Sequence, residues 1–420
     1  MKILKFGGAS VKDAEGVKNL EKVLKITGTS DVLIIVSAMG KTTNALEEVI
    51  DHYYHSKHKL QSSIQAVKKY HNAILLDLFE NESEPVFEVV SRLFQELTDF
   101  FDRNKSPDYN FVYDQTVGYG ELVSTTIISH YLNNKGIKNN WLDVRELIKT
   151  NTNYRNAKVE WSSTQKNIKT ALSLDKLIVT QGFIASDINN FTTTLGREGS
   201  DYSSAIFAFC LNAKSVTIWK DVPGVLNADP RYFENASLLD QLSYEEAIEL
   251  SYYGASVIHP KTLQPLQRKE IPLYVKSFLN PKQTGTKIAK NLKLSPNIPC
   301  YILRKHQVLI SVSSLDFSYI VEENISHIFK LLHLHKMKVH LIQNSAISFS
   351  VCIENNFDTL EGLLLELKAK YKVSIEKGVN VFTLRHHNQQ AIDEIEKNKR
   401  VLLKQITPKT VQILTLPKKS

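Results

Sequence analysis

Short apolar runs alternate with amphipathic segments over the first 280 residues of the chain. The runs predict strands at 3–6, 32–36, 141–144, 177–180, 216–219 and 273–275. Val17, Leu20 and Leu24 follow the first run at helical spacing, with Asp13 as the predicted N-cap, and residues 45–103 keep the same period. The alternation of buried strands with helices predicts an α/β domain built on a sheet.

The pattern changes beyond residues 280–299, a stretch that is rich in Pro, Lys, Asn and Gly and has little apolar periodicity. We place a domain boundary there. The pattern that follows predicts strands at 308–312, 338–342, 346–353, 373–375 and 379–384, and helices at 320–334 and 360–371. These elements make a small α+β unit. A further helix at 391–396 and strands at 401–405 and 410–416 predict a second, reduced copy of it.

Composition and charge describe an ordinary globular protein with an excess of positive charge. The 52 Lys and Arg residues against 44 Asp and Glu residues give a net charge of +8, which suits acidic small molecules or nucleic acid as partners. No basic arm or aromatic-rich RNA-binding motif concentrates that charge, so nucleic acid is the less favoured partner. No apolar run approaches the roughly 20 residues of a membrane span. We expect a cytoplasmic protein that has no membrane partner.

Histidines and cysteines give no clear metal site. The three cysteines are scattered and odd in number, which argues against a metal motif and a disulfide framework, and favours a reducing compartment. His52, His55 and His58 share helical spacing, but no Cys or well-placed carboxylate accompanies them, so a solvated helix face is favoured over a metal site. We assign no residue as a metal ligand.

The end of the first strand carries the first candidate chemistry. Lys5 lies at the carboxyl end of the apolar run and is followed by Gly7 and Gly8, where a backbone without Cβ can approach a ligand closely. Ligands of open α/β sheets bind outside the carboxyl ends of strands, so a cation and two glycines suit a phosphate. A plain strand-to-turn junction explains the same residues. The small polar loop 37–44 after the second run allows the same two interpretations.

The densest polar segment, residues 192–204, leads into an apolar helix predicted at 205–211. Ser200 or Asp201 can cap that helix, which is the purely structural interpretation. Arg197 beside the exposed N–H groups of a helix N-terminus also makes a site for anionic groups. Glu121 falls in the first turn of another predicted helix, where the helix dipole favours a carboxylate and where the side chain can also bind an ammonium group.

Taken together, these segments resemble the aspartate kinases, members of the amino-acid kinase family that carry C-terminal ACT regulatory domains. The matching elements are Lys-Phe-Gly-Gly-Ala-Ser at 5–10, Gly-Glu at 120–121, Gln-Gly-Phe-Ile at 181–184, Thr-Thr-Thr-Leu-Gly-Arg at 192–197, Gly-Ser-Asp at 199–201, Trp-Lys-Asp-Val-Pro-Gly at 219–224 and Ala-Asp-Pro-Arg at 228–231. Their order and combination over the first 260 residues are highly specific. In the C-terminal part the resemblance rests on the order of elements and on Gln-Asn-Ser-Ala-Ile-Ser at 343–348.

The resemblance implies a fold and an activity. The expected fold is a three-layer αβα sandwich with a mainly parallel sheet over residues 1–290, followed by a ferredoxin-like α+β ACT region at 304–420. That region is expected to hold one full unit at 304–378 and a shortened one at 379–420. The implied reaction transfers the ATP γ-phosphoryl group to the side-chain carboxylate of L-aspartate, giving 4-phospho-L-aspartate at the start of lysine, threonine and methionine synthesis. Mg²⁺ is expected on the phosphates. Length argues against a fused homoserine dehydrogenase.

The same resemblance assigns roles to residues. Lys5 is expected to stabilise the transferred phosphoryl group and Asp201 to orient active-site groups, without a base, because the substrate carboxylate is already ionised. Arg197 is expected to bind a carboxylate of aspartate and Glu121 its amino group. Three hydroxyl side chains are expected to complete the amino-acid pocket: Ser37, Thr43 and Ser200. ATP is expected along Lys5, Gly7, Gly8, Ser10, Lys220, Asp221, Leu226, Arg231, Ser256 and Val257.

Several positions depart from the family pattern. Glu198 replaces a usual Gly, Leu226 an aromatic residue and Ser256 a usual Lys. The last change removes a cation from the expected nucleotide edge and predicts an altered affinity for ATP. Lysine-sensitive relatives carry an Asp at the position of His340, so we expect weak or altered feedback by lysine.

The resemblance also implies a homodimer or higher homo-oligomer, with an effector such as lysine or threonine at the ACT interface. The candidate allosteric residues are His340, Asn344 and Ser345. Two alternatives remain open: another amino-acid kinase, acting on glutamate or N-acetylglutamate, and a catalytically inert amino-acid sensor. The ACT tail favours aspartate as the substrate. The retained Lys5 and Asp201 argue against an inert sensor.

Overall fold

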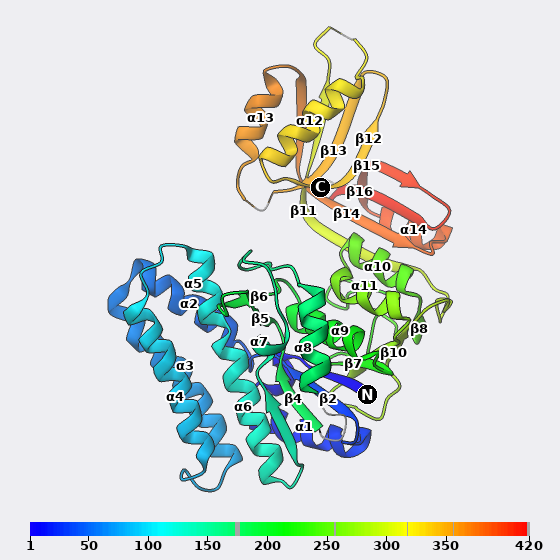
Figure 1. Cartoon of the computed structure of the whole chain (residues 1–420). Helices are drawn as coiled ribbons and strands as arrows, with labels where there is room; N and C mark the ends of the chain where they lie inside the picture. The colour runs from blue at the N-terminus through cyan, green and yellow to red at the C-terminus, as the bar shows by residue number, and fades with distance from the viewer. Residues whose placement is uncertain (173–176, 256–257, 317, 356, 418–420) are drawn as a thin grey trace. The chain divides into compact units, whose positions relative to one another are not determined.

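The computed structural model describes residues 1–172, 177–255, 258–316, 318–355 and 357–417 (Figure 1). The chain divides into two compact units. The first comprises Met1–Leu226, Leu238–Ile248 and Val257–Pro296, and the second comprises Asn227–Ser237, Glu249–Ser256 and Asn297–Ser420. The predicted domain limits of 1–290 and 304–420 stay a prediction. Of the helices in the part of the chain that is described, none has the length and apolar character to span a membrane.

An eight-stranded sheet organises the first unit, in the order β3-β4-β2-β1-β7-β9-β10-β8. Its strands are β1 (Lys2–Phe6), β2 (Val32–Val36), β3 (Asn139–Leu142), β4 (Leu177–Gln181), β7 (Ser215–Lys220), β8 (Gln241–Leu242), β9 (Leu273–Ser277) and β10 (Thr286–Ile288). Neighbouring strands are parallel except β9 and β10, which pair antiparallel. β5 (Ile184–Ser186) and β6 (Thr192–Thr194) form a separate antiparallel pair.

Helices cover both faces of this sheet. The described helices of residues 1–269 are the short 3-10 helix η1 (Gly8–Val11), α1 (Ala14–Thr27), α2 (Thr42–His55), α3 (Lys57–Leu78), α4 (Pro85–Arg103), α5 (Tyr109–Val117), α6 (Tyr119–Asn134), α7 (Val144–Leu147), α8 (Trp161–Ala171), α9 (Gly199–Leu211), α10 (Tyr244–Tyr253) and α11 (Pro260–Lys269). On one face, α1 to α6 share a hydrophobic core with the strands. On the other, α9 packs on β1, β2 and β7, with α8 and α11 beside it. The predicted three-layer α/β fold is confirmed.

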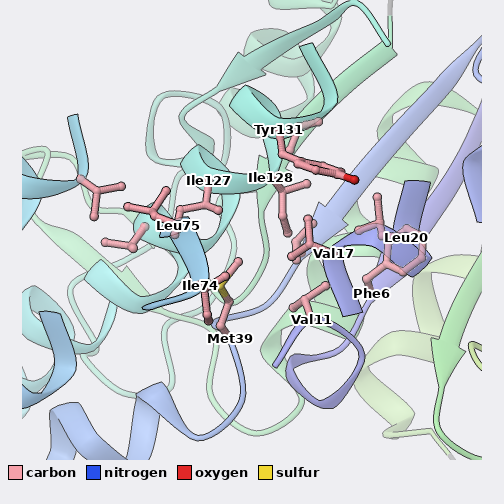
Figure 2. Close-up of a cluster of buried hydrophobic side chains, with 14 of the residues drawn as sticks. Phe6, Val11, Val17, Leu20, Met39, Ile74, Leu75, Ile127, Ile128 and Tyr131 are labelled. Atoms are coloured by element: carbon pink, nitrogen blue, oxygen red, sulfur yellow. The ribbon is translucent and has the colours of Figure 1, made fainter. Parts of the chain in front are cut away.

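Strand periodicity decides which side of the sheet receives the first candidate cation. Phe6 packs into the core with Leu20 of α1 and Ile128 of α6 (Figure 2). Successive side chains of a strand point to opposite faces, so Lys5 faces the other layer, where α9 lies. The apolar pattern of β1 therefore fixes the direction of its one buried cation.

Most predicted elements are present, with two corrections. The strand predicted at 141–144 ends at Leu142, because the Asp143 side chain accepts a hydrogen bond from the Arg145 N–H and caps α7. The runs at 373–375 and 379–384 belong to one strand, β14 (Lys372–Arg385). Its pairing with β11 (Cys300–Ser313) continues through a register shift at Gln307, so no turn separates them.

The second unit is an α+β structure, as predicted. Its six-stranded antiparallel sheet has the order β12-β13-β11-β14-β16-β15, in which β12 is Lys338–Asn344, β13 Ser348–Glu354, β15 Lys399–Ile406 and β16 Thr410–Pro417. α12 (Glu322–Leu334) and α13 (Leu360–Lys368) share one core with β11, and α14 (Gln389–Glu396) shares another with β14 and β16. Within the described residues 379–417, α14 is the one helix. The assignment of two ACT units stays a prediction.

Candidate active site

A pocket of about 580 Å³ lies in the first unit, where the parallel strands β1, β2 and β7 end. The segments that follow these strands, together with the N-terminus of α9, supply most of its wall. The lining residues are Lys5, Gly7, Gly8, Ala9, Ser10, Ser37, Thr43, Tyr113, Glu121, Arg155, Phe183, Thr194, Gly196, Arg197, Glu198, Gly199, Ser200, Asp201, Trp219, Lys220 and Asp221. The carboxyl edge of the sheet is thus the place where the candidate residues meet.

Lys5 and Asp201 form a buried ion pair in this pocket. Lys5 Nζ lies 2.7 Å from Asp201 Oδ1, and Lys220 Nζ lies 3.9 Å from Asp201 Oδ2. Lys5 comes from β1, Lys220 from the end of β7 and Asp201 from the first turn of α9. Two cations and one carboxylate leave one net positive charge, which suits a phosphate group.

The charge of Asp201 is maintained by its two lysine neighbours. Burial by itself would raise the pKa of the Asp201 carboxyl, but the charges of Lys5 and Lys220 outweigh burial and lower that pKa below its ordinary value. Asp201 is therefore ionised at neutral pH. An ionised Asp201 can hold the Lys5 ammonium group in a fixed position.

Two glycines shape the edge of the pocket next to Lys5. A Cβ on Gly8 would lie 2.6 Å from the Ala38 carbonyl oxygen, and the Gly40 N–H donates to the Gly8 carbonyl at 3.0 Å. A Cβ on Gly7 would lie 3.5 Å from Lys5 Nζ, so space is open there. The buried Ser10 Oγ has no hydrogen-bond partner among the described residues. Open space, a cation and an unpaired hydroxyl fit the phosphates of a nucleotide.

Glu121 lies buried at the pocket, in the first turn of α6. Its Oε1 accepts a hydrogen bond from the Ala38 N–H at 3.3 Å, while its Oε2 has no hydrogen-bond partner in the part of the chain that the structure describes. Burial raises the pKa of the Glu121 carboxyl to about 8, although the Ala38 N–H and the charge of Lys5 act to lower it. A carboxylate in this position can accept an ammonium group, whose charge compensates for the loss of solvent.

The N-terminus of α9 differs from the prediction. α9 begins at Gly199, and the residue before it, Glu198, has a left-handed backbone with φ 53° and makes no side-chain cap. The prediction that Ser200 or Asp201 caps this helix is wrong, because both lie in its first turn. The Glu198 carboxylate instead accepts a hydrogen bond from the His259 N–H at 2.8 Å. A left-handed backbone is the conformation that glycine adopts most easily, which gives a physical reason for the glycine expected at this position.

The remaining predicted amino-acid contacts also line the pocket. Arg197 is exposed, and Ser37, Thr43 and Ser200 come from the ends of β2, α2 and α9. A Cβ on Gly182 would lie 2.5 Å from the Ser200 Cβ, so the segment after β4 holds this helix terminus closely. Guanidinium, hydroxyl and carboxylate groups therefore converge on one volume. This is a donor set for a small amino acid with anionic groups.

Comparison with known proteins places this site in a family. A sequence model described as the Amino acid kinase family matches residues 1–277. The chain belongs to the amino acid kinase family. Residues 1–277 include all the lining residues of the pocket, so the pocket is a candidate active site of an amino acid kinase.

Several curated proteins are similar to this amino acid kinase. Lysine-sensitive aspartokinase 3 of Escherichia coli is 30% identical over 394 residues, which are 91% of this chain and 86% of that protein. The chloroplastic bifunctional aspartokinase/homoserine dehydrogenase 2 of Arabidopsis thaliana is 29% identical over 391 residues, 89% of this chain and 42% of that protein. The chain thus spans less than half the length of the bifunctional relative.

Solved structures agree with these relatives. E. coli aspartokinase III in complex with lysine and aspartate has a TM-score of 0.82 and 28% identity, with 99% of this chain and 96% of that chain covered. E. coli aspartokinase III in complex with aspartate and ADP has a TM-score of 0.81 and 27% identity over the same shares. The resemblance to aspartate kinases that the motifs predicted is confirmed.

Two described residues among the predicted nucleotide contacts of this amino acid kinase, Leu226 and Arg231, do not line the pocket. Leu226 forms an isolated bridge with Leu238. Arg231 belongs to the second compact unit, where its guanidinium pairs with Asp229 at 2.6 Å. Ser256 and Val257 lie outside the described residues. The nucleotide role of these four residues remains a prediction.

The structure also brings residues into the pocket that the sequence did not single out. Thr194, Gly196 and Phe183 lie inside motifs of the family, so their neighbourhood was a usable signal. Tyr113 and Arg155 carry no such signal, because neither lies in a recognised motif or at the end of a predicted strand. They enter the pocket from α5 and from the irregular segment that leads to α8.

The predicted allosteric residues lie on or next to β12 in the second unit. His340 Nε2 lies 3.2 Å from Glu354 Oε2 and 3.5 Å from Arg304 Nη1. Burial and the Arg304 charge lower the pKa of His340 to about 4, although Glu354 acts to raise it. His340 is therefore neutral at pH 7. Ser345 lines a cavity of about 320 Å³ with Gln343, Ser348, Ser350, Leu402, Leu403 and Lys404, whereas His340 and Asn344 do not.

Proposed function

We propose that this amino acid kinase is an aspartate kinase. It transfers the γ-phosphoryl group of ATP to the side-chain carboxylate of L-aspartate and forms 4-phospho-L-aspartate, the first step of lysine, threonine and methionine synthesis. The observation that carries this proposal is the buried pair of Lys5 and Asp201 in one pocket with Glu121 and Arg197. The aspartate and ADP bound to the similar E. coli aspartokinase III support it.

Charge stabilisation is the main task of the chain in this reaction. The aspartate carboxylate is ionised at neutral pH and needs no base, but it must approach the negatively charged nucleotide. Lys5 stabilises charge on the transferred phosphoryl group, and Asp201 holds Lys5 in place at 2.7 Å. Lys220 adds a second cation on the same side of the pocket. When no substrate is bound, the negative charge of Asp201 offsets part of the positive charge of Lys5 and Lys220.

The amino-acid end of the pocket orients the substrate. Glu121 accepts the substrate ammonium through the oxygen that has no partner among the described residues. Arg197 binds a substrate carboxylate through its planar guanidinium. The hydroxyl groups of Ser37, Thr43 and Ser200 supply the remaining donors. Together these contacts hold one carboxylate towards Lys5, which is what in-line transfer requires.

The nucleotide is proposed to lie along Gly7, Gly8, Ser10, Lys220 and Asp221. Mg²⁺ bound with ATP would neutralise part of the charge of the phosphates. Among the described residues, no group of three or more His, Cys, Asp or Glu side chains is arranged to hold a metal ion. We propose that the ion arrives with ATP and that Asp221, which lines the pocket, would help to hold it.

A different amino-acid kinase is the second candidate. The unpaired Glu121 oxygen favours a substrate with a free amino group, so it argues against N-acetylglutamate. It does not separate aspartate from glutamate. That choice rests on the relatives, which are aspartokinases.

The test is a hydroxylamine trap for the acyl phosphate. The enzyme is incubated with MgATP and, in separate reactions, with L-aspartate, L-glutamate and N-acetyl-L-glutamate, and hydroxamate formation is measured. We expect hydroxamate with aspartate alone. Hydroxamate with glutamate but not with aspartate would overturn the substrate assignment. No hydroxamate with any of the three, together with binding of aspartate, would favour the sensor.

Regulation is proposed from the lysine bound to the similar E. coli aspartokinase III, and assembly from the family resemblance of the motifs. We expect a cytoplasmic homodimer or higher homo-oligomer with an amino-acid effector bound at the second unit. The neutral His340, which faces Arg304 and Glu354, supplies no negative charge for a lysine side chain, and this supports weak or altered lysine feedback. Activity titrated with lysine and threonine, separately and together, tests this proposal. Micromolar inhibition by lysine alone would contradict it.

A further inference from the structure

Arg155 is a second arginine in the pocket, and none of the roles above uses it. It lies in an irregular segment between α7 and α8 and lines the pocket together with Tyr113, Thr194 and Arg197. Its side chain is exposed. An exposed arginine can lie beside a pocket by chance, whereas a binding residue is held in place by its neighbours.

The backbone of Arg155 is held firmly. Its N–H donates to both carboxylate oxygens of the buried Asp114, at 3.1 and 3.0 Å. The same carboxylate accepts the N–H and the hydroxyl of Thr194, both at 2.8 Å. The Ala157 N–H donates to the Thr194 carbonyl at 2.9 Å. Asp114 thus ties the Arg155 segment to β6, the strand that leads directly to Arg197.

Arg155 also has an unusual backbone conformation that this anchoring enforces. Its φ is 67°, in the left-handed region that residues with a Cβ seldom adopt. A Cβ on Gly196 would lie 3.2 Å from the Arg155 carbonyl oxygen, so the segment packs against the backbone next to Arg197. A freely moving surface segment would relax from such a conformation. The segment is instead fixed against the wall that carries Arg197.

The guanidinium group is positioned without using its hydrogen-bond donors. Its Cζ lies 4.4 Å from the ring centroid of Tyr113 and 5.6 Å from that of Tyr109. The Tyr113 hydroxyl donates to Glu47 at 2.8 Å, which holds the ring. The guanidinium makes no hydrogen bond or salt bridge to any of the described residues. Stacking on an aromatic face leaves the in-plane N–H groups available for a ligand.

We propose that Arg155 is a positioning and specificity residue that binds the α-carboxylate of the amino-acid substrate together with Arg197. This inference rests on the proposed function, because it takes the substrate to be a dicarboxylic amino acid. The side-chain carboxylate must point towards Lys5 and Lys220 to receive the phosphoryl group. The second carboxylate then lies towards the wall of Thr194, Gly196 and Arg197, where the Arg155 donors are placed. A guanidinium fork matches a carboxylate in two hydrogen bonds.

The first test compares substrates that differ only in the α-carboxylate. Arg155→Ala and Arg155→Lys are assayed with L-aspartate and with its α-amide, which keeps the amino group and the reacting carboxylate. We expect KM for aspartate to rise about 10- to 100-fold in Arg155→Ala and kcat to change little, since a lost charge-assisted hydrogen bond has this weight. KM for ATP and the kinetics with the α-amide should stay within about twofold of the wild type. An equal loss with both substrates, or no change with aspartate, would overturn the proposal.

A control and a binding measurement separate this inference from the proposed function. Arg103→Ala removes an exposed arginine at the end of α4, whose guanidinium lies 3.8 Å from the Asp99 carboxylate. This variant should change neither KM for aspartate nor KM for ATP. Tyr113→Leu removes the stacking face but keeps Arg155, and should raise KM for aspartate part of the way. L-aspartate is also titrated calorimetrically into the wild type and Arg155→Ala. If Arg155→Ala binds aspartate more weakly and the wild type shows no turnover, the kinase assignment is contradicted and the role of Arg155 in binding is supported. Turnover by the wild type, together with equal aspartate binding by the wild type and Arg155→Ala, would support the kinase and contradict the role of Arg155.

Discussion

Lys5 Nζ and Asp201 Oδ1 lie 2.7 Å apart, and their side chains are 9% and 4% exposed. Lys5 lies near the end of β1 and Asp201 in the first turn of α9, so the contact exists only in the folded α/β unit. Each charge compensates for the burial of the other, as the lowered pKa of Asp201 reflects. Because Asp201 is ionised, its carboxylate holds the Lys5 side chain in position next to the site of phosphoryl transfer.

Replacement of Lys5 is expected to abolish turnover. Lys5→Met removes the cation nearest to Asp201, and loss of one preorganised charge-stabilising donor lowers kcat by about 100- to 1,000-fold. Lys220→Met removes the cation that lies farther from Asp201, at 3.9 Å, and should lower kcat less. Steady-state rates of both variants with saturating aspartate and MgATP decide the order. If Lys5→Met keeps more than a tenth of the wild-type kcat, Lys5 is not part of the chemistry.

The same variant can lose activity because it unfolds, so a second substitution is needed as a control. Breaking a buried ion pair costs about 3–5 kcal/mol of stability when the remaining charge stays buried. The double variant that carries both Lys5→Met and Asp201→Asn removes the remaining buried charge as well. We expect the double variant to regain thermal stability and to remain inactive. Recovery of both stability and activity would mean that Lys5 serves the fold alone.

The pH dependence of aspartate use should report on Glu121. Its carboxyl has a pKa of about 8, because burial disfavours the charged form. Only the ionised form attracts the substrate ammonium, so kcat/KM for aspartate should rise with pH, with the midpoint of the rise near pH 8. In the complex the ammonium stabilises the carboxylate, so the rise in kcat should occur at lower pH. A kcat/KM that falls as pH rises through 8 would show that the protonated acid is the binding form.

Glu121 should also shift the stability of the unliganded protein with pH. Its pKa in the folded state lies above its ordinary value of 4.5, so folding favours the protonated form. The stability that Glu121 contributes is present below about pH 4.5 and is lost as pH rises through about 8. Relative to Glu121→Gln, the wild type should lose on the order of 3–5 kcal/mol across this window. Urea unfolding of both proteins from pH 5 to 9 tests it, and parallel curves would contradict the burial of an unpaired carboxyl.

The fold was largely predictable because its signals are local. The apolar runs of β1 and β2 have the predicted limits within one residue, since buried parallel strands need near-continuous hydrophobic residues. The pocket was predictable where a motif follows a strand, as at Gly7, Ser37 and Lys220. Each of these residues lies at the carboxyl end of a parallel strand, and such ends meet at one edge of the sheet.

Other parts could not be predicted because they depend on contacts between distant segments. The Glu198 carboxylate accepts a hydrogen bond from the N–H of His259, sixty-one residues later in the chain. Arg155 reaches the pocket only because Asp114 of α5 binds its backbone and Tyr113 stacks on its side chain. No spacing rule along the chain connects these residues. The sequence therefore indicates where strands end but not which loop residues are folded onto those ends.

The two glycines after β1 allow a matched test of shape against stability. A Cβ on Gly8 would lie 2.6 Å from the Ala38 carbonyl and 3.1 Å from the Gly40 carbonyl, both of them backbone atoms that cannot move aside alone. Gly8→Ala should therefore push the segments after β1 and β2 apart and destabilise the protein by about 1–3 kcal/mol. Thermal unfolding and kcat should both fall.

Gly7→Ala should behave differently, because its Cβ would meet Lys5 Nζ at 3.5 Å and the Trp219 carbonyl at 4.0 Å, which are ordinary contacts. The backbone there is extended, with φ −77°, so alanine fits without strain. We expect an unchanged melting temperature and a raised KM for ATP, since the methyl group would occupy space next to the Lys5 ammonium. If Gly7→Ala binds ATP as the wild type does, the phosphates do not pass over Gly7, and the nucleotide path inferred for this edge of the sheet is wrong. Loss of stability in Gly7→Ala but not in Gly8→Ala would instead contradict the packing of the two segments.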